Sequence, residues 1–549
     1  MPTSISRRNF VKTAALGVAA AGAAGACASG ALATEGSHTF ADTIAWDSEY
    51  DVVVLGIGFS GMASAMTAAD EGASVLICEK LKDGFAGGNS RVCAQLFLWG
   101  NDDAEATKAY MTDLNGTREV PEDVVDAYAQ GIASLGTTLS ETFGMDASEF
   151  VDVANMGYGC MSPEYPEFEG SDKVHLYATH EGAFDSYLYQ SMRERLAQLY
   201  ADKVDVWFES PATHLIQDPQ SKAIIGVQVQ RGGETRNVRA INGVVLATGG
   251  FEGDQEMVKN YLNLVNYVCA GGTDNTGDGI RMAQEVGANL WHMDSYCGLG
   301  GFGAVSFVVD DGAPAARIHD FDLGAINTGA SILVGKDGGR WVNESYVPRH
   351  GKFPTTNGQW LNPEFPDGIF AVFDETQKKA INDAGDIPDA YADQVIECAD
   401  VAAAAKAIGC DEDALQETID DFDTFVDAGK DYQCGRDVST MRAFEGDKLY
   451  VIPLKPVMLN TQGGPERSAA AEVIDVQGDP IPHLYSAGEC GGVNAFQYAG
   501  GGNVAECFVF GRIAGKNAAA KKDALPEYKS AEFVESSPKK LGDETDLKA

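Results

Sequence analysis

The 549-residue sequence lacks the cysteine spacings that bind redox metals. Its eleven cysteines include no Cys-x-x-Cys pair, no Cys-x-x-Cys-His haem-attachment motif and no ferredoxin-like run. The chain is therefore expected to bind no metal and to carry no covalent haem, although an iron–sulfur cluster built from distant cysteines stays open. Most of the cysteines are expected to be small, buried hydrophobic side chains.

Basic residues are also scarce. The chain has 40 lysines and arginines against 81 aspartates and glutamates, which gives a formal net charge of −41. This charge argues against nucleic acid and anionic lipid as partners and favours a soluble protein. Long apolar runs are absent after residue 33, so no membrane-spanning helix is expected there. The remaining length, roughly 500 residues, is typical of two or three domains.

The first 33 residues have the pattern of a twin-arginine export signal. Ser6-Arg-Arg-Asn-Phe-Val-Lys12 precedes an alanine- and glycine-rich apolar stretch that is too short to span a membrane comfortably, and residues 31–33 form a small-x-small cleavage site. Cys27 leaves lipoprotein processing open as an alternative. The sequence predicts export by the twin-arginine machinery to the periplasm or cell envelope. This route carries folded proteins, which suits a cargo that acquires a cofactor in the cytoplasm.

The most informative segment runs from Tyr50 to Glu79, where a short apolar run, a glycine turn and a second apolar run follow one another. Gly56 permits the tight turn, Gly58 lets the backbone approach a pyrophosphate, and Gly61 lets the following helix pack closely on the strand. The helix N-terminus, which includes Ser60, presents N–H groups to the phosphates. Glu79 ends the second run, where a carboxylate accepts hydrogen bonds from ribose hydroxyls. The segment predicts a dinucleotide site.

Apolar periodicity predicts an α/β fold. Helices are expected over 104–114, 122–143, 184–201, 391–428 and 504–520, and strands over 204–209, 213–240 and 242–250. A nucleotide-binding fold that begins near the N-terminus and is completed near the C-terminus implies an insertion, and inserted domains usually cover the site. The expected division gives 48–296 and 441–522 to a Rossmann-like nucleotide-binding domain, 297–440 to an inserted α+β capping domain, and 523–549 to a charged tail.

Further glycine clusters fit the same site. Gly87-Gly-Asn-Ser90 follows the second strand, Ala247-Thr-Gly-Gly250 ends a core strand, and Ala487-Gly-Glu489 lies near the C-terminus. Each places bare backbone along the path of a long cofactor. In this order the elements resemble the flavoprotein superfamily of fumarate reductases, urocanate reductases and 3-ketosteroid dehydrogenases. The resemblance covers roughly residues 48–520, including Gly339-Arg-Trp-Val-Asn-Glu344 and Phe510-Gly-Arg-Ile-Ala-Gly515.

The resemblance implies FAD as cofactor, with the inserted domain closing over the flavin ring and Glu489 on the ribityl hydroxyls. No histidine follows Gly87-Gly-Asn-Ser90, where covalent members carry one, so the FAD is expected to be non-covalent. The cofactor-binding residues that the motifs and the resemblance together imply are Gly56, Gly58, Ser60, Gly61, Glu79, Gly87, Gly88, Asn89, Ser90, Thr248, Gly249, Gly250, Asp278, Glu489, Gly502, Asn503 and Val504.

The same resemblance points to two candidate proton donors. Arg349 follows Glu344 by five residues, whereas the fumarate reductases have an arginine four residues after the Asn-Glu motif. Tyr346 lies nearer, in a region where ketosteroid dehydrogenases use a tyrosine. A free guanidinium is a poor acid, with a pKa above about 12, so an arginine donor needs a relay from carboxylates. A surface salt bridge is the alternative role for Arg349.

The sequence departs from the fumarate reductases at the three places where they bind a dicarboxylate. Gly324–Asn327, Asn460–Gly464 and Asn494–Tyr498 lack the expected cations, so fumarate is not the expected substrate. Tyr498-Ala-Gly-Gly-Gly502 instead resembles the Tyr-Pro-Gly-x-Gly of ketosteroid dehydrogenases, in which the tyrosine hydroxyl and the last glycine N–H polarise a carbonyl. A packed aromatic is the alternative role for Tyr498. Four further residues are candidates for the pocket lining: His180, His292, Tyr296 and His350.

These features predict an exported FAD-dependent oxidoreductase that reduces a C=C bond conjugated with a neutral carbonyl. An enone, a ketosteroid or an unsaturated lactone such as that of a cardiac glycoside would accept hydride from flavin N5 and a proton from a side chain. The alternatives are a ketosteroid-type dehydrogenase running the reverse reaction and a reductase of a non-fumarate unsaturated carboxylate. A non-catalytic flavin electron carrier is disfavoured because the inserted domain covers the flavin. With no haem motif in the chain, the electron donor is expected to be a membrane-anchored or periplasmic cytochrome.

Overall fold

The computed structural model describes residues 38–157, 161–182, 185–299, 302–310, 312–316, 318 and 323–529. Residues 40–525 form one compact body, to which the described residues 38–39 and 526–529 do not belong. The predicted signal peptide, with Cys27, lies outside the described residues, and so does most of the predicted charged tail. Within the described ranges, no helix has the length and apolarity needed to cross a membrane.

The first sheet has eight strands and a parallel centre. Its main path runs β22-β23-β9-β1-β2-β6, and neighbouring strands from β23 to β6 are all parallel. A hairpin of β7 and β8 continues the sheet from β9 in antiparallel register. The bounds are β1 Ser48–Leu55, β2 Val75–Cys78, β6 Val204–Trp207, β7 Ala212–Gln217, β8 Ile224–Arg231, β9 Glu234–Leu246, β22 Glu472–Ile474 and β23 Pro480–Ser486.

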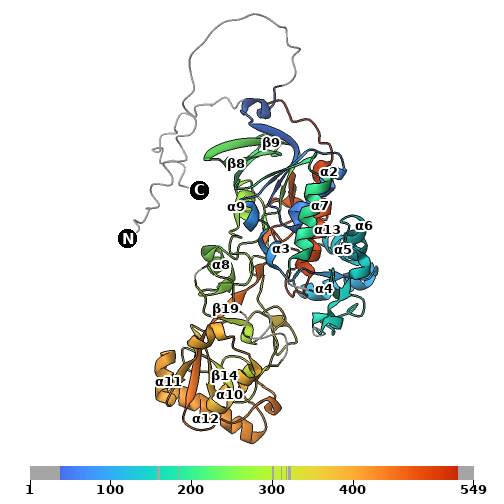
Figure 1. Cartoon of the computed structure of the whole chain (residues 1–549). Helices are drawn as coiled ribbons and strands as arrows, with labels where there is room; N and C mark the ends of the chain where they lie inside the picture. Colours follow the sequence, from blue (N-terminus) through green and yellow to red (C-terminus); the bar gives the residue numbers. More distant parts are fainter. Residues whose placement is uncertain are drawn as a thin grey trace, which may run out of the picture. The chain divides into compact units, whose positions relative to one another are not determined.

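Both faces of this sheet are covered by hydrophobic cores. Side chains alternate along each strand, so neighbouring residues of one strand enter opposite cores. Val52 and Val54 of β1 face a core shared with α2 and α13, whereas Val53 and Leu55 face a second core. Helix α2 (Phe59–Asp70) packs against α13 (Gly502–Ala519) and α7 (Tyr187–Leu199), which lie beside it in Figure 1. The opposite core includes side chains of α8 (Gln255–Leu262) and α9 (Asp278–Glu285).

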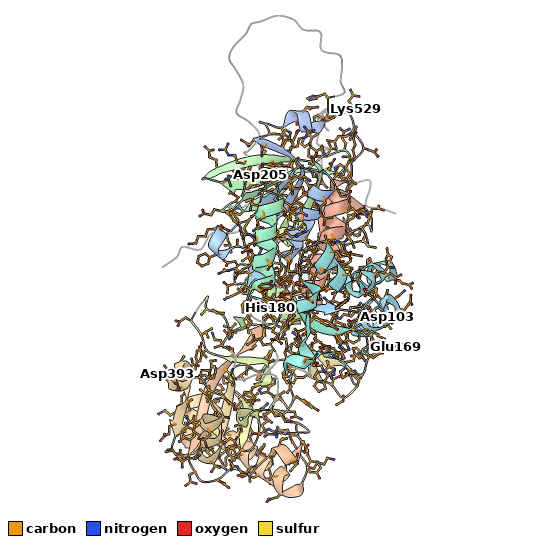
Figure 2. The ribbon with its side chains drawn as sticks, turned by 45° about the vertical axis from the view of Figure 1, so that its right-hand side comes forward. Asp103, Glu169, His180, Asp205, Asp393 and Lys529 are labelled. Carbon is orange, nitrogen blue, oxygen red and sulfur yellow. The ribbon has the colours of Figure 1, made fainter. Side chains whose placement is uncertain are left out.

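Five of the described α-helices have an aspartate at the N-cap. Carboxylates accept hydrogen bonds from first-turn backbone N–H groups at Asp103, which Figure 2 labels, and at Asp254, Asp374, Asp400 and Asp411. Such caps satisfy N–H groups that have no partner within the helix. The remaining helices are α3 Gly88–Val92, α4 Ala104–Asn115, α5 Glu122–Ala133, α6 Leu135–Glu141, α10 Glu375–Ala384, α11 Val401–Ile408 and α12 Glu412–Ala428. Part of the large acidic excess therefore stabilises helix N-termini.

The second sheet is formed mainly by the predicted capping domain. It has six strands, with β10-β19-β17-β14 as its path and with β13 and β18 paired to β19. The strands are β10 Val268–Cys269, β13 Val305–Phe307, β14 Ser331–Gly335, β17 Ile369–Asp374, β18 Ile396–Cys398 and β19 Leu449–Met458. Helices α10, α11 and α12 lie around it in Figure 1, and separate hydrophobic cores cover its two faces.

The remaining strands form small sheets. One sheet has three strands: β3 Leu96–Trp99, β4 Val151–Asp152 and β5 His175–Ala178. The other three are two-stranded. They pair β11 Leu290–Trp291 with β21 Gly464–Pro465, β12 Tyr296–Cys297 with β20 Asn460–Thr461, and β15 Phe353–Pro354 with β16 Trp360–Leu361. The predicted α/β class is confirmed. The domain boundaries stay predictions, but β19 pairs with the second sheet although the sequence placed it in the nucleotide-binding domain.

Candidate active site

A cavity of about 340 Å³ opens where the parallel strands β1, β2 and β9 end. Its lining includes the residues that follow each strand: Gly56 after β1, Glu79 after β2 and Thr248 after β9. Ligands of open α/β sheets bind at these carboxyl ends. We call the part around Gly56, Glu79 and Asp278 the nucleotide end, and the part around Leu176, Leu299, His350, Tyr498 and Gly500 the substrate end.

The nucleotide end depends on two glycines that no side chain could replace. A Cβ atom on Gly56 would lie 2.3 Å from the carbonyl oxygen of Ala247, and Gly56 has a φ of +102°. A Cβ atom on Gly61 would lie 2.0 Å from the carbonyl oxygen of Gly56. The N-terminus of α2 therefore approaches β1 closely enough to present its N–H groups to phosphates. Glu79 is buried, and its carboxylate accepts hydrogen bonds from the N–H groups of Ile57 at 3.2 Å and Leu81 at 2.9 Å.

Helix α3 contributes the second glycine cluster. Gly87 and Gly88 have φ values of +109° and +52°, and both line the cavity. The hydroxyl of Ser90 accepts a hydrogen bond from the N–H of Phe59 at 2.9 Å, which joins α3 to the first turn of α2. The amide of Asn89 donates to Glu252 at 2.7 Å and to Glu489 at 2.9 Å.

Glu252 and Glu489 form a buried carboxyl pair beside the cavity. Glu489 also accepts a hydrogen bond from the N–H of Thr461 at 3.0 Å, and Glu252 accepts one from the amide of Asn275 at 2.6 Å. Burial raises the pKa of Glu252, and burial together with the neighbouring Glu252 raises the pKa of Glu489 well above its usual range. Two adjacent buried carboxyl groups resist double ionisation, so a protonated Glu489 is able to donate as well as accept a hydrogen bond.

The other predicted cofactor-binding residues also gather here. Ser60, Thr248, Gly249, Asp278, Asn503 and Val504 line the cavity, whereas Gly61, Gly250 and Gly502 do not. A Cβ atom on Gly250 would lie 2.5 Å from Glu489 Oε1. Asp278 accepts a hydrogen bond from Lys80 Nζ at 2.9 Å. Among described residues that line the cavity, Lys80 is the one lysine or arginine, and it belongs to the nucleotide end.

These residues fit FAD. Bare backbone at Gly56, Gly58 and Gly249 leaves room for a long cofactor, and Glu79 and Glu489 are placed to bind hydroxyl groups. Two buried polar atoms of the lining, Asn460 Oδ1 and Asn503 Nδ2, have no hydrogen-bond partner among the described residues. An unpaired acceptor and an unpaired donor suit the amide edge of a flavin ring, because buried polar atoms need partners. The non-covalent attachment stays a prediction.

The side chains that we assign to the substrate end are mostly apolar. Leu96, Met161, Leu176, Leu299 and Ala315 line it together with Tyr498 and His350. The Tyr498 hydroxyl accepts a hydrogen bond from the N–H of Asn503 at 3.3 Å, which leaves its own proton free for a ligand. Burial raises the pKa of Tyr498 well above its ordinary value, so the side chain stays a neutral donor. The predicted partner, the N–H of Gly502, instead donates to the carbonyl of Ala499 at 3.0 Å.

The two predicted proton donors do not line this cavity. The guanidinium of Arg349 lies 2.6 Å from a carboxylate oxygen of Glu167 and stacks over the rings of Trp360 and Tyr165, at 4.0 and 4.6 Å from their centroids. Tyr346 is 38% exposed. Their predicted catalytic roles stay untested, but the arrangement of Arg349 matches the salt bridge that the sequence left open.

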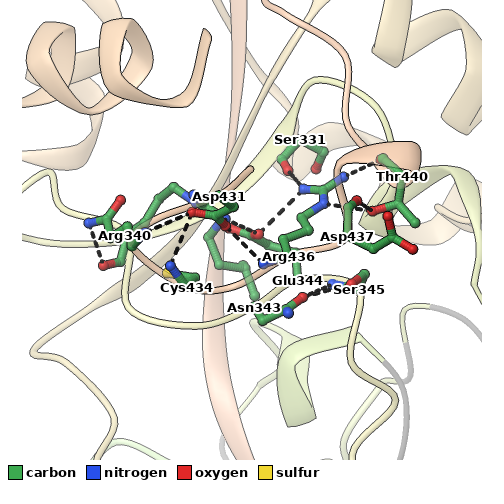
Figure 3. Close-up of polar contacts among 12 residues, drawn as sticks. Ser331, Arg340, Asn343, Glu344, Ser345, Asp431, Cys434, Arg436, Asp437 and Thr440 are labelled. Atoms are coloured by element: carbon green, nitrogen blue, oxygen red, sulfur yellow. Dashed lines mark hydrogen bonds and ion pairs between the residues drawn. The ribbon is translucent and has the colours of Figure 1, made fainter. Parts of the chain in front are cut away.

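The Asn-Glu motif holds the second sheet together (Figure 3). Arg340 donates to both carboxylate oxygens of Glu344, at 3.0 and 2.7 Å, and to Asp431 at 3.1 Å. Arg436 reaches Glu344 at 3.3 Å and the carbonyl of Ser331 at 2.7 Å. The side chains of Arg340, Glu344, Asp431 and Arg436 are all fully buried. This motif therefore has a structural role, since none of these four residues lines the cavity.

The remaining candidates lie elsewhere. His180, labelled in Figure 2, pairs with Asp185 at 3.0 Å, and the ring of His292 stacks on Trp291 at 4.4 Å. Burial lowers the pKa of His292 to about 4, and Tyr296 is buried in the core beside β9. Within the described ranges, no group of three or more potential metal ligands comes together. The prediction that the chain binds no metal stays untested.

Several residues of the site escaped the sequence analysis. Asn275 and Asn460 line the cavity, Glu252 binds Asn89, and Glu164 binds His350 at 2.8 Å. Glu252 had a usable signal, because it lies two residues after the Gly249-Gly250 cluster. Asn460 begins a stretch that was discussed above only because it lacks a cation. The side-chain amide of Asn460 itself was not considered.

Comparisons with known proteins agree with this geometry. The FAD binding domain family matches residues 51–504. The chain is 28% identical to a digoxin reductase of Eggerthella lenta, over 94% of this chain and 97% of that protein, and 27% identical to a urocanate reductase of the same species, over 86% and 75%. A crystal structure of 3-ketosteroid Δ1-dehydrogenase from Sterolibacterium denitrificans shares the fold, with a TM-score of 0.67 and 20% identity, over 86% of this chain and all of that one. The chain therefore belongs to the FAD binding domain family, and it is an FAD-dependent oxidoreductase that acts on carbon–carbon single and double bonds.

Proposed function

We propose that the protein reduces a C=C bond conjugated with an uncharged carbonyl, as in an enone, a ketosteroid or an unsaturated lactone. The observation that carries the proposal is the substrate end of the cavity. Among the described lining residues that we assign to it there is no lysine or arginine, and its polar side chains include Tyr498 and His350. A carboxylate substrate would lose its hydration there without gaining a lysine or arginine as partner, and His350 is already paired with Glu164.

The roles of the chain's residues follow from this lining. Bound FAD supplies the hydride, which carries two electrons. Leucine, methionine and alanine side chains exclude water and pack against an apolar substrate, while the Tyr498 hydroxyl donates to its carbonyl oxygen. Negative charge develops on that oxygen during reduction, and a fixed donor in an apolar cavity stabilises it more than water does.

Similarity to the digoxin reductase supports a neutral lactone as the substrate class, because that relative matches nearly the whole chain. The likeness of Tyr498-Ala-Gly-Gly-Gly502 to the ketosteroid dehydrogenases supports a second candidate, the reverse reaction on a ketosteroid. Both directions use the same atoms, so the redox potential of the electron-transfer partner decides between them.

A substrate panel tests the proposal. Purified holoenzyme under anaerobic conditions, with reduced viologen as electron donor, would be offered a 4-en-3-one steroid, an unsaturated lactone, urocanate, a cinnamate and fumarate. We expect turnover with the neutral carbonyl compounds and little with the carboxylates. Turnover of fumarate faster than that of every neutral compound would refute the proposal, and oxidation of a saturated ketosteroid by an artificial acceptor would favour the reverse direction.

We also propose that the enzyme is exported and receives electrons from a cytochrome of the membrane or periplasm. The pair Arg7-Arg8 ahead of a short apolar stretch supports export, and the absence of a haem motif from the sequence supports a separate donor. Replacing both arginines by lysine should retain the full-length protein in the cytoplasm, as measured by cell fractionation. Unchanged export of this variant would contradict the twin-arginine route.

A further inference from the structure

A histidine and a glutamate form a hydrogen-bonded pair at the substrate end of the cavity. His350 Nδ1 lies 2.8 Å from both carboxylate oxygens of Glu164. One of these oxygens also accepts a hydrogen bond from the N–H of Gly500 at 2.8 Å, so the carboxylate is fixed by the glycine turn that follows Tyr498. The side chains of His350 and Glu164 are 12% and 5% exposed, which makes this a partly buried and well-satisfied pair.

The pair lies beside the proposed carbonyl donor. The rings of His350 and Tyr498 meet edge to face, with centroids 4.8 Å apart and an interplanar angle of 83°. Both residues line the cavity, whereas Glu164 does not. Since Glu164 occupies Nδ1, the other ring nitrogen, Nε2, is free for a ligand, and no described residue forms a hydrogen bond with it.

The nearby cationic side chains of Arg349 and Lys352 are bound to other protein groups. Arg349 is bound to Glu167 outside the cavity lining. Lys352 is buried and does not line the cavity. Its Nζ donates to the carbonyl of Tyr296 at 2.7 Å and to Asn362 at 3.1 Å. Among the described residues that we assign to the substrate end, His350 and Tyr498 are thus the side chains placed to donate a proton to a ligand.

We propose that His350, positioned by Glu164 and acting as an imidazolium, is the acid that protonates the substrate's α-carbon in place of an arginine. This inference rests on the proposed function. Hydride adds to the β-carbon and the C=C π bond breaks, which places its electron pair on the α-carbon and the carbonyl oxygen. The Nε2–H bond then breaks, and its proton forms the new C–H bond at the α-carbon. The imidazole becomes neutral and takes a proton from water before the next turnover.

Glu164 is a positioning residue in this scheme. Its carboxylate binds Nδ1 and so fixes which ring nitrogen faces the ligand. The same logic applies wherever an acid or base side chain is oriented by a second group. A purely structural pair would tie two segments together without affecting where a proton is delivered.

Deuterium labelling separates these roles. Reduced holoenzyme in D₂O would be mixed with whichever unsaturated substrate reoxidises it, and the product examined by NMR for deuterium at the α-carbon. We expect the wild type to deliver deuterium to one face. His350→Ala should slow reoxidation by about 10² to 10⁴ and lose facial selectivity, and added imidazole should restore part of the rate. His350→Gln provides a second variant that keeps more of the side chain's volume, and it should also lose selectivity.

His175→Gln is the matched control. His175 Nδ1 pairs with Asp152 at 2.6 Å, but neither residue lines the cavity, so this variant should keep the rate and the label. Glu164→Gln should be slower while still labelling the same face. The inference is overturned if His350→Gln retains both rate and selectivity, or if Arg349→Lys loses them instead. Failure of the proposed function would look different, because the wild type would then be reoxidised by carboxylates and not by neutral carbonyls, and the labelling test would proceed with those.

Discussion

Replacing Tyr498 by phenylalanine removes one hydroxyl from the substrate end of the cavity and leaves its ring in place. The hydroxyl accepts a hydrogen bond from the N–H of Asn503 at 3.3 Å, and its proton is the donor that we assign to the substrate's carbonyl oxygen. Loss of one such donor costs about 2.7 to 4 kcal/mol of transition-state stabilisation, which corresponds to a rate about 10² to 10³ lower. The expected effect is on the chemical step, because the apolar packing of the substrate is unchanged.

The assay is the anaerobic reoxidation of reduced enzyme in a stopped-flow spectrophotometer, followed by the return of the flavin's visible absorbance. Tyr128→Phe is the matched control. The hydroxyl of Tyr128 donates to the carbonyl of Gly502 at 2.8 Å, one residue from Asn503 in the first turn of the same helix, but Tyr128 does not line the cavity. This control should lose about 1 kcal/mol of unfolding free energy and keep its rate. A Tyr498→Phe rate within about threefold of the wild type, at equal FAD content, would remove the hydroxyl from the reaction.

Three further predictions follow from the described contacts. Gly61→Ala should weaken FAD binding about tenfold or more in a fluorescence titration, because a Cβ atom would overlap a backbone oxygen and overpacking costs about 1 to 3 kcal/mol, whereas Gly84→Ala, which meets open space, should bind normally. Glu344→Gln should lower the urea-unfolding free energy by about 3 to 5 kcal/mol because it leaves Arg340 buried without its full partner, and an unchanged midpoint would contradict the structural role of the motif. Burial lowers the pKa of His292 from 6.5 to about 4, so the unfolded state binds a proton between these pH values that the native state does not. The free energy of unfolding should therefore fall as the pH falls from 6.5 to about 4, and His292→Asn, which tolerates the residue's positive φ, should flatten that part of the curve.

The sequence was sufficient for the parts of the fold that local patterns determine. The glycine spacing at Gly56 and Gly61 reflects backbone contacts that no other residue permits, and the helices α4, α7 and α13 begin within about three residues of the predicted positions. The strands of the second sheet were harder to predict from the sequence. Strands β14, β17 and β19 are buried on both faces, so they show no alternation of polar and apolar residues that would mark them as strands.

The substrate end could be predicted only in part. Tyr498 was identifiable from its glycine-rich neighbours, but the choice between Arg349 and His350 depends on which of two adjacent side chains faces the cavity. These residues lie in an irregular loop, where neither a helical nor a strand period fixes direction. Glu164 is 186 residues away from His350 along the chain, and nothing local marks it as a partner. The Asn-Glu motif differs, because its residues were recognisable in the sequence but their role in stabilising the second sheet was not.

The most direct test of the proposed preference for an uncharged substrate compares a lactone with its hydrolysed form. An α,β-unsaturated lactone and the ring-opened unsaturated carboxylate made from it share the reacting C=C bond and differ in net charge. The rate constant for anaerobic reoxidation of the reduced enzyme would be measured with each at several concentrations. A substrate end without lysine or arginine predicts that the lactone reacts at least about tenfold faster at limiting concentration, because the carboxylate must lose its hydration while His350 is already paired with Glu164. Equal rates, or a faster reaction of the carboxylate, would contradict the account.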